Sequence, residues 1–459
     1  MTSSRGFRTL PRREFLHRTA TALAAGSLPS LLRAAVQRPW SPRLLLRGSW
    51  KSVNIGDIAH TPGALRLFEL YFPEAEITLW PGKFEFGTRE LLQRWFPRLK
   101  FAEGLLDAQG RPTTVELWEA WARSDLLVHG SSSGFGAREQ VEAWLRATGR
   151  PFGALGISTD PVTGFGGGRV PEGGTLEAIR TKIQQLPAHH LEENERQTYA
   201  RARFLFCRDT LSRDYLRAQK VVPRAEFGPD SAFAFHLRDD VRADTYLRAH
   251  GLEHRRFICV IPRRRYTPYY QMAGTPASPE DLVRDEISAR SLASDHAKMR
   301  ELMVAWVKNT GGKVLACPEM TYEVELAKKE LVDPLPAEVR KHVVWREHYW
   351  LPDEAASVYA NAQAVISMEC HSPILALING TPAIYLRQPT DTIKGQMYRD
   401  IGLGDWLREI DETSGQTLWA TVEQISSDPE KARRLVREAM TRVETLQRQM
   451  MLAVRASVA

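Results

Sequence analysis

The chain has 459 residues, of which 43% are hydrophobic and 25% charged, an ordinary composition for a folded protein. This length exceeds a typical single domain, so we expect two or three hydrophobic cores. The formal net charge of +7 is spread along the chain without a long Lys/Arg block. It permits anionic substrates but gives no indication of nucleic-acid binding. The four cysteines form no Cys-x-x-Cys pair, which argues against a zinc or thioredoxin-like site.

The first 35 residues resemble a bacterial export signal. The twin-arginine run Arg12–Leu16 precedes a weakly apolar stretch over residues 19–32, and Ala34-Ala35 offer small residues for cleavage. This pattern predicts a twin-arginine signal over residues 1–35, and hence a periplasmic or cell-envelope location. The alternative is a basic amphipathic first helix in a cytoplasmic protein. Apart from a signal anchor, no segment approaches the roughly 20 apolar residues of a transmembrane helix.

Short apolar runs then alternate with amphipathic segments. Expected strands cover residues 43–47, 75–80, 125–129, 151–156 and 202–206, and expected helices cover 57–71, 88–95, 113–123, 138–148 and 210–218. This alternation predicts an α/β fold, with a parallel sheet covered by helices on both faces. We assign residues 43–240 to a first Rossmann-like domain.

The second half repeats the pattern. Expected strands cover residues 256–261, 313–317, 342–345 and 364–367, and expected helices cover 296–308, 322–331 and 353–360. We assign residues 253–423 to a second Rossmann-like domain and residues 424–459 to a C-terminal helical segment. Two long loops are expected, a glycine-rich one over 163–174 and one over 263–295. Loops of that length inside a compact domain are often lids or binding loops.

The stretch from Ile366 to Tyr385 carries the strongest functional signal. Its pattern predicts a buried strand, a polar turn with His371, an apolar helix that ends at Gly380, and a second strand. In open α/β sheets, ligands bind outside the carboxyl ends of strands. An imidazole there can titrate near neutral pH. The alternative is a structural histidine that bonds the backbone.

Other polar loops also follow expected strands. Their residues of interest are Asn54, Gly56 and Asp57 after the first strand, Gly130 and Ser131 in a glycine- and serine-rich loop, and Arg208 and Asp230 further on. Small residues allow backbone N–H groups to approach a ligand, and Asn or Asp can cap a helix. Turn and capping chemistry alone is the alternative explanation for each loop.

Basic side chains gather at two more loops. Arg263, Arg264 and Arg265 follow a strand and precede Tyr266, and Lys394 lies beside a glycine. Arginine grips phosphate or carboxylate bidentately, and tyrosine adds hydrogen bonds or sugar stacking. The loops therefore suit an anionic substrate, with a solvated basic turn as the alternative.

Taken in order, these elements resemble the polysaccharide pyruvyl transferase family. The match runs over roughly residues 43 to 408. The matching residues are Asn54, Ile55, Gly56 and Asp57, the loop Gly130 to Gly136, Arg208, Asp209 and Ser212, Pro229, Asp230 and Ala232, and finally His371, Gly380, Pro382 and Lys394. The resemblance implies two Rossmann-like domains in a GT-B-like arrangement, with the site between them.

The sequence departs from the family pattern at two places. Glu369 stands where the family has an arginine, two residues before the histidine, and three serines replace glycines after Gly130. That arginine is implied to hold the charge of the donor. Glu369 would repel an anion unless it is protonated or paired with one of the arginines at 263–265.

The resemblance implies transfer of a pyruvyl group from phosphoenolpyruvate to a glycan sugar, as in exopolysaccharide biosynthesis, with no cofactor and no metal. In this scheme Arg263, Arg264 and Lys394 hold the anion. His371 is the general acid/base or a donor to the phosphate, and Asp57 and Glu369 activate hydroxyls or bind the sugar.

Export and a phosphoenolpyruvate donor conflict, because this donor is a cytoplasmic metabolite. Two alternatives therefore stay open. One is glycosyl transfer by a GT-B-like enzyme, which would need a nucleotide-sugar site. The other is an exported, non-catalytic glycan-binding protein on a transferase scaffold.

Overall fold

The computed structural model describes residues 41–48, 51–163 and 172–458, so the expected signal over 1–35 and most of the glycine-rich loop lie outside the described residues. The first sheet has the strand order β3-β2-β1-β4-β5-β6-β7, and all its pairs are parallel. Its strands are β1 (Arg43–Arg47), β2 (Glu76–Leu79), β3 (Lys100–Phe101), β4 (Leu126–His129), β5 (Phe152–Ile157), β6 (Ala202–Cys207) and β7 (Glu226–Phe227).

The second sheet is also parallel, with the order β10-β9-β8-β11-β12-β13. Its strands are β8 (Phe257–Ile261), β9 (Lys313–Ala316), β10 (Val343–Trp345), β11 (Ala364–Ser367), β12 (Ala383–Arg387) and β13 (Leu407–Glu409). Its central strands are apolar and buried along their whole length, as strands covered on both faces should be.

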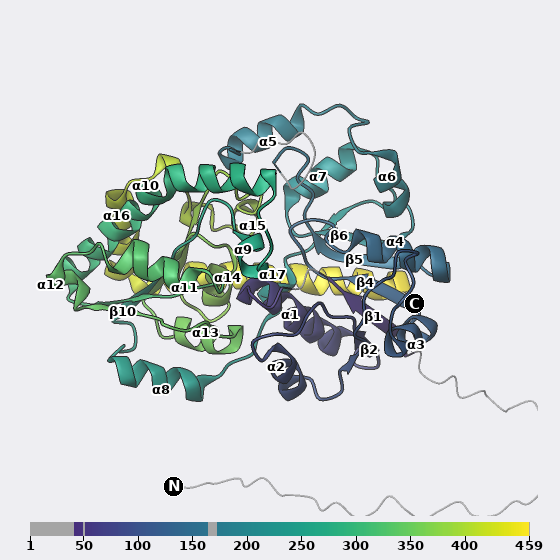
Figure 1. The fold of residues 1–459 in the computed structure, drawn as a ribbon, viewed down its shortest axis with the longest axis horizontal. Helices are drawn as coiled ribbons and strands as arrows, with labels where there is room; N and C mark the ends of the chain where they lie inside the picture. The colour runs from purple at the N-terminus through teal and green to yellow at the C-terminus, as the bar shows by residue number, and fades with distance from the viewer. Residues whose placement is uncertain (1–40, 49–50, 164–171, 459) are drawn as a thin grey trace, which may run out of the picture. The chain divides into compact units, whose positions relative to one another are not determined.

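Helices connect the strands and cover the sheets (Figure 1). Those of the first half are α1 (Ile55–Tyr71), α2 (Thr88–Trp95), α3 (Val115–Arg123), α4 (Arg138–Thr148), α5 (Leu176–Gln184), α6 (Glu193–Tyr199), α7 (Thr210–Ala218) and the short η1 (Ser231–Ala234). Those that follow are α8 (Asp240–His250), α9 (Tyr269–Ala273), α10 (Pro279–Thr310), α11 (Glu323–Leu326), α12 (Ala337–Arg340), α13 (Pro352–Tyr359), α14 (His371–Leu377) and α15 (Gln396–Asp400). Three short helical turns, η2 (Ala327–Val332), η3 (Gly404–Trp406) and η4 (Ile410–Glu412), complete this half.

The chain ends in two helices, α16 (Gly415–Ser427) and α17 (Pro429–Val458). Helix α17, yellow in Figure 1, packs against α1 and β6 of the first half, so the C-terminus returns to the first sheet. The apolar face of α17 is buried and includes Val436, Ala439 and Val443. Within the described ranges, no helix combines the length and apolar character required to cross a bilayer.

The structure confirms the predicted α/β class, the two parallel sheets and the helical C-terminus. Residues 41–459 form one compact unit by contact, so the predicted division into domains at 43–240, 253–423 and 424–459 stays a prediction.

The expected loop over residues 263–295 is wrong, because α10 already begins at Pro279. Ser278 and Asp281 form a reciprocal capping box at its start, and Gly311 ends the helix in the left-handed region. The first turns of α10 are mostly polar and half-exposed, so the apolar period that predicts a helix is weak there. Asn54, and not Asp57, caps α1 by accepting from the N–H groups of Gly56 and Asp57.

Candidate functional site

A cavity of about 360 Å³ lies where the carboxyl ends of strands from both sheets meet. Its walls come from the segments after β1, β4 and β6 of the first sheet and after β8, β9, β11 and β12 of the second. Backbone hydrogen bonds join the halves here, since Ile55 N–H donates to Glu319 O and Thr321 N–H donates to Val53 O. The cavity therefore occupies the edge at which open α/β sheets bind ligands.

Eight of the residues expected from the sequence line this cavity. They are Asn54, Asp57, Arg208, Arg263, Tyr266, Glu369, His371 and Lys394. They come from five loops that are far apart in the sequence, and the fold brings them together.

The remaining five expected residues do not line the cavity. Gly56 lies directly under His371, because a Cβ on Gly56 would come 2.2 Å from its Nδ1. Ser131 is buried and bonds Leu155 O and Ser231 N–H, while Asp230 is buried beneath the cavity against Arg208. Gly130 packs beside Gly48, and Arg264 pairs loosely with Asp285 at 3.8 Å; the structure thus gives these five supporting positions.

His371 begins α14 and is buried, with 5% of its surface exposed. Its Nδ1 lies 3.4 Å from Glu319 Oε1 and 3.4 Å from Cys370 Sγ. Glu319 is held in place because its Oε2 accepts the Ser372 N–H at 2.6 Å. Burial alone would lower the pKa of His371, but Cys370 and the Glu319 carboxylate raise it well above its ordinary value. The ring is therefore an imidazolium near neutral pH and can donate a proton.

Glu369 is paired, which is the second of the two ways in which the sequence could accommodate it. Its Oε1 lies 2.7 Å from Arg263 Nε, and Arg263 also contacts the buried Asp391. Burial raises the pKa of Glu369, while the Arg263 cation opposes this shift. Arg263 thus neutralises two carboxylates of the protein, so it is not a free cation for an anionic donor.

Lys394 and Asp57 face the cavity with uncommitted charges. Among residues 41–48, 51–163 and 172–458, neither side chain has an ion-pair or hydrogen-bond partner. Both are half-buried. Burial lowers the pKa of Lys394, and the carboxylate of Glu369 works in the opposite direction. These two residues therefore offer a bound molecule a cation and a carboxylate.

Sequence reasoning misses several residues of the cavity. The missed residues are Lys51, His60, Thr267, Tyr269, Arg284, Met320, Thr390 and Thr392, whereas Ser133, Gly136 and Arg265 also line the cavity and belong to loops that the sequence did single out. His60 was detectable, since it lies four residues after Gly56 and hence on the same face of α1. Glu319, three residues after β9, carries the same strand-end signal as the loops that the sequence did single out.

Within the described part of the chain, the nitrogen and oxygen atoms of one group of side chains approach closely enough to hold a metal. The group is His60, Asp230 and His371, whose ligand atoms lie within 4.8 Å of one another. Asp230 Oδ2 is already engaged, because it accepts from Arg208 Nη1 at 2.7 Å. His60 Nδ1 is buried without a hydrogen-bond partner, whereas a histidine bound to metal usually donates through its second nitrogen. The arrangement therefore suits hydrogen bonding better than metal binding.

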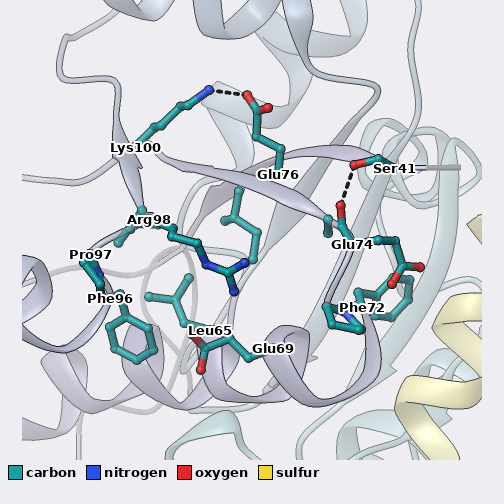
Figure 2. Close-up of a pocket in the computed structure, with 14 residues that line it drawn as sticks. Ser41, Leu65, Glu69, Phe72, Glu74, Glu76, Phe96, Pro97, Arg98 and Lys100 are labelled. Atoms are coloured by element: carbon teal, nitrogen blue, oxygen red, sulfur yellow. Dashed lines mark hydrogen bonds and ion pairs between the residues drawn. The ribbon is translucent and has the colours of Figure 1, made fainter. Parts of the chain in front are cut away.

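A second cavity of about 320 Å³ lies at the amino ends of β1, β2 and β3, at the opposite edge of the first sheet (Figure 2). Lys100 pairs with Glu76 at 2.5 Å across its rim, and Ser41 bonds the Glu74 carbonyl. Its polar groups are partly satisfied by each other and do not converge on one point. We therefore assign the functional site to the first cavity.

The sequence model of the polysaccharide pyruvyl transferase family matches residues 54–388. The match begins at Asn54, the N-cap of α1, and ends at Gln388, directly after β12. It therefore includes cavity loops of both sheets. No curated protein sequence matches the chain.

Several solved structures have a similar fold. A putative UDP-N-acetylglucosamine 2-epimerase from Listeria monocytogenes has a TM-score of 0.55 at 12% identity, covering 91% of this chain and 96% of its own. MnaA from S. aureus, solved with UDP, has a TM-score of 0.54 at 10% identity, covering 87% and 91%. Anabaena HepE, solved with UDP-glucose, has a TM-score of 0.52 at 10% identity, covering 90% and 99%. At such identities the likeness shows a shared GT-B-like fold.

Proposed function

The chain is a member of the polysaccharide pyruvyl transferase family, and from this premise we propose that it transfers a pyruvyl group from phosphoenolpyruvate to a glycan sugar. The observation that carries the proposal is His371, a buried imidazolium in a cavity that also holds Lys394 and Asp57. The reaction needs an acid for the methylene carbon, a base for a sugar hydroxyl and a cation for the donor. These three side chains supply one group of each kind.

In the proposed reaction, His371 donates a proton to the methylene carbon of phosphoenolpyruvate, and a sugar oxygen bonds to the neighbouring carbon. Asp57 accepts the proton of that hydroxyl. Inorganic phosphate then leaves with the proton held by Asp57 as the carbon–oxygen bond to it breaks, and a second sugar hydroxyl closes a cyclic ketal and returns its proton to His371. Lys394 neutralises part of the donor charge throughout, as a preorganised cation does in a water-poor site.

The position of Glu369 shapes this proposal. Arg263 is occupied by Glu369 and Asp391, and Arg265 by Asp295 and Asp411, so neither replaces the arginine that the family places two residues before the histidine. Lys394 then carries the main attraction for the donor. We therefore expect phosphoenolpyruvate to bind weakly and its binding to depend strongly on Lys394.

The test uses the full chain, phosphoenolpyruvate and simple methyl hexosides with adjacent free hydroxyls. We expect millimolar phosphoenolpyruvate to raise the unfolding temperature, and Lys394→Gln to remove most of that shift. We expect phosphate release with a hexoside to require His371. No thermal shift and no phosphate release at millimolar donor would contradict the proposal.

Nucleotide-sugar transfer is the second candidate, favoured by the fold shared with UDP-bound MnaA and HepE. It predicts that UDP or UDP-glucose, and not phosphoenolpyruvate, raises the unfolding temperature. A shift with UDP alone would decide for this candidate, and binding of glycan without release of phosphate or UDP would favour a binding protein.

Export by a twin-arginine signal remains part of the proposal and is supported by the Arg12–Leu16 run. Cell fractionation and N-terminal sequencing of the mature protein test it. Replacement of both arginines by lysine should retain the protein in the cytoplasm. An unprocessed N-terminus in the cytoplasmic fraction would contradict export and would remove the conflict with a cytoplasmic donor.

A further inference from the structure

Two buried histidines from different halves of the chain meet in the wall of the cavity. His60 on α1 faces His371 on α14, with their Nε2 atoms 3.1 Å apart and their rings edge to face. His60 is only 3% exposed. The proposed reaction uses His371 and assigns no role to His60.

Carboxylates flank this pair on both sides. Glu319 Oε1 lies 3.4 Å from His371 Nδ1, and Asp230 Oδ2 lies 3.2 Å from His60 Nε2. Arg208 Nη1 lies 2.7 Å from the same Asp230 oxygen and is itself fully buried. The five side chains form a continuous polar chain from the second sheet to the first.

The distance between the two Nε2 atoms determines how protons are arranged. Two N–H groups facing each other at 3.1 Å would clash, and two lone pairs would repel, so one proton lies between the rings. Whichever ring carries it, Asp230 is close enough to act as its counter-charge. The two imidazoles are therefore expected to titrate as a pair and not as separate groups.

We infer that His60 is a positioning residue for His371: the two share one proton between their Nε2 atoms, and His60 fixes the ring orientation and charge of the catalytic histidine. This role rests on the proposed function where it concerns turnover. The shared proton itself does not depend on that function. It follows from the distances within the pair and from the burial of both rings.

Other charged and titratable groups also face the pair. They are Cys370 beside His371, Glu319 from the loop after β9, Asp230 and Arg208 from the first half, and Lys394, whose charge acts on Cys370. The charged side chains closest to the two rings are the carboxylates of Glu319 and Asp230, at 3.4 and 3.2 Å, and these favour an extra proton on the histidine pair. His60→Leu keeps these charged groups, removes the partner of His371 Nε2, and leaves Asp230 paired with Arg208.

The test is histidine-selective ¹⁵N NMR on the full chain without substrate, comparing wild type, His60→Leu and His60→Gln. In wild type we expect the His60 and His371 signals to shift together, with His371 protonated well above pH 6.5. In His60→Leu we expect a single-site titration of His371, with its pKa lower by about one unit or more because the imidazolium loses a hydrogen-bond acceptor. His60→Gln keeps an acceptor oxygen, so it should restore the high pKa while abolishing the paired titration.

Activity adds an independent readout. Because His371 must be protonated, kcat should fall as the pH rises through its pKa. We expect this high-pH limb of the kcat profile to shift with the NMR value in His60→Leu and to recover in His60→Gln. If wild type releases no phosphate from phosphoenolpyruvate, the proposed reaction fails while the NMR comparison still decides on the pair.

Three results would overturn the inference. One is an unchanged His371 titration in folded His60→Leu. Another is a paired titration that persists in His60→Gln, which decides the matter even if the leucine variant does not fold. The third is a stoichiometric transition metal in the purified protein that is lost in His60→Gln, since a metal would occupy both Nε2 lone pairs.

Discussion

Each half of the chain has a buried histidine at the carboxyl end of a central strand of its sheet. β4 pairs with β1 in the first sheet, and β11 pairs with β8 in the second, so the two strands occupy equivalent places. His129 is the last residue of β4, and His371 follows β11 at the start of α14. By sequence pattern alone, both are strand-end histidines in front of a helix.

Their surroundings differ completely. His129 Nδ1 donates to Gly130 O at 2.7 Å, and its Nε2 accepts the Ala137 N–H at 3.2 Å, so both nitrogens of a neutral ring are satisfied by backbone. Burial lowers its pKa to about 4. His371 instead faces Glu319, Cys370 and His60, and its pKa is raised. The role of a strand-end histidine is thus set by charges that arrive from distant segments.

The largest expected effect separates the two histidines by activity. His371→Ala should lower kcat by about 10²–10⁴-fold, the usual contribution of a general acid or base, without unfolding the protein. His129→Gln should leave turnover at pH 7 unchanged. Phosphate release and far-UV circular dichroism of both variants check this, and equal losses in the two would erase the distinction between them.

The charged surroundings of His371 can be broken at Arg263. Arg263→Met leaves the buried carboxylates of Glu369 and Asp391 without their counter-charge, so we expect a loss of about 3–5 kcal/mol in the free energy of unfolding. Adding Glu369→Gln should recover part of this loss, because it removes one of the two unpaired carboxylates. Arg43→Met, at an exposed pair with Asp125, is the matched control and should leave the denaturant midpoint almost unchanged. Equal shifts in Arg263→Met and Arg43→Met would contradict the buried network.

Much of the fold follows from local sequence. Strands such as Arg43–Arg47 and helices such as Thr210–Ala218 are correct to the residue, because apolar period, capping residues and flanking turns agree there. The first turns of α10 are the exception, since their polar residues give no clear period. Two-residue strands such as β3 and β7 escape prediction because too few residues carry the pattern.

The site was predictable only as a set of strand ends. The parallel topology brings Asp57, His371 and Lys394 to one edge, as their positions after strands predict. Pairings across the halves were not predictable, because the contact of His60 with His371 joins residues 311 positions apart. The sequence raised the pairing of Glu369 with one of the arginines at 263–265, but it did not indicate which arginine, nor that Asp391 would contact the same side chain.

The neutral state of His129 gives a pH-dependent prediction. Its folded pKa of about 4 lies below the ordinary 6.5, so its contribution to stability is present above pH 6.5 and is lost as the pH falls toward 4. The gap corresponds to about 3 kcal/mol. The difference in unfolding free energy between pH 7 and pH 4 should therefore shrink by about this amount in His129→Gln. Urea titrations at both pH values measure it, and an unchanged difference would show that His129 is protonated in the folded state.

A glycine accompanies each histidine, and the first of the two supports the catalytic ring. A Cβ at Gly56 would lie 2.2 Å from His371 Nδ1, so Gly56→Ala must displace that ring. A displacement of about 1 Å can lower a rate about 10²-fold, and we expect a loss of this size in kcat. The NMR signal of His371 should move in the same variant, and normal turnover with an unmoved signal would contradict the packing.

The smallest effect is expected at the other glycine. A Cβ at Gly130, which accepts the His129 hydrogen bond through its carbonyl, would meet Leu46 Cδ1 at 3.8 Å, an ordinary contact. The backbone there does not adopt positive φ, so alanine fits without strain. Gly130→Ala should then stabilise the protein by about 0.4–1 kcal/mol through the unfolded state and leave kcat unchanged. Paired urea titrations and phosphate release measure both quantities. A clear loss of activity with retained stability would mean that the backbone of this loop contacts substrate directly, and that the end of β4 belongs to the catalytic site as the end of β11 does.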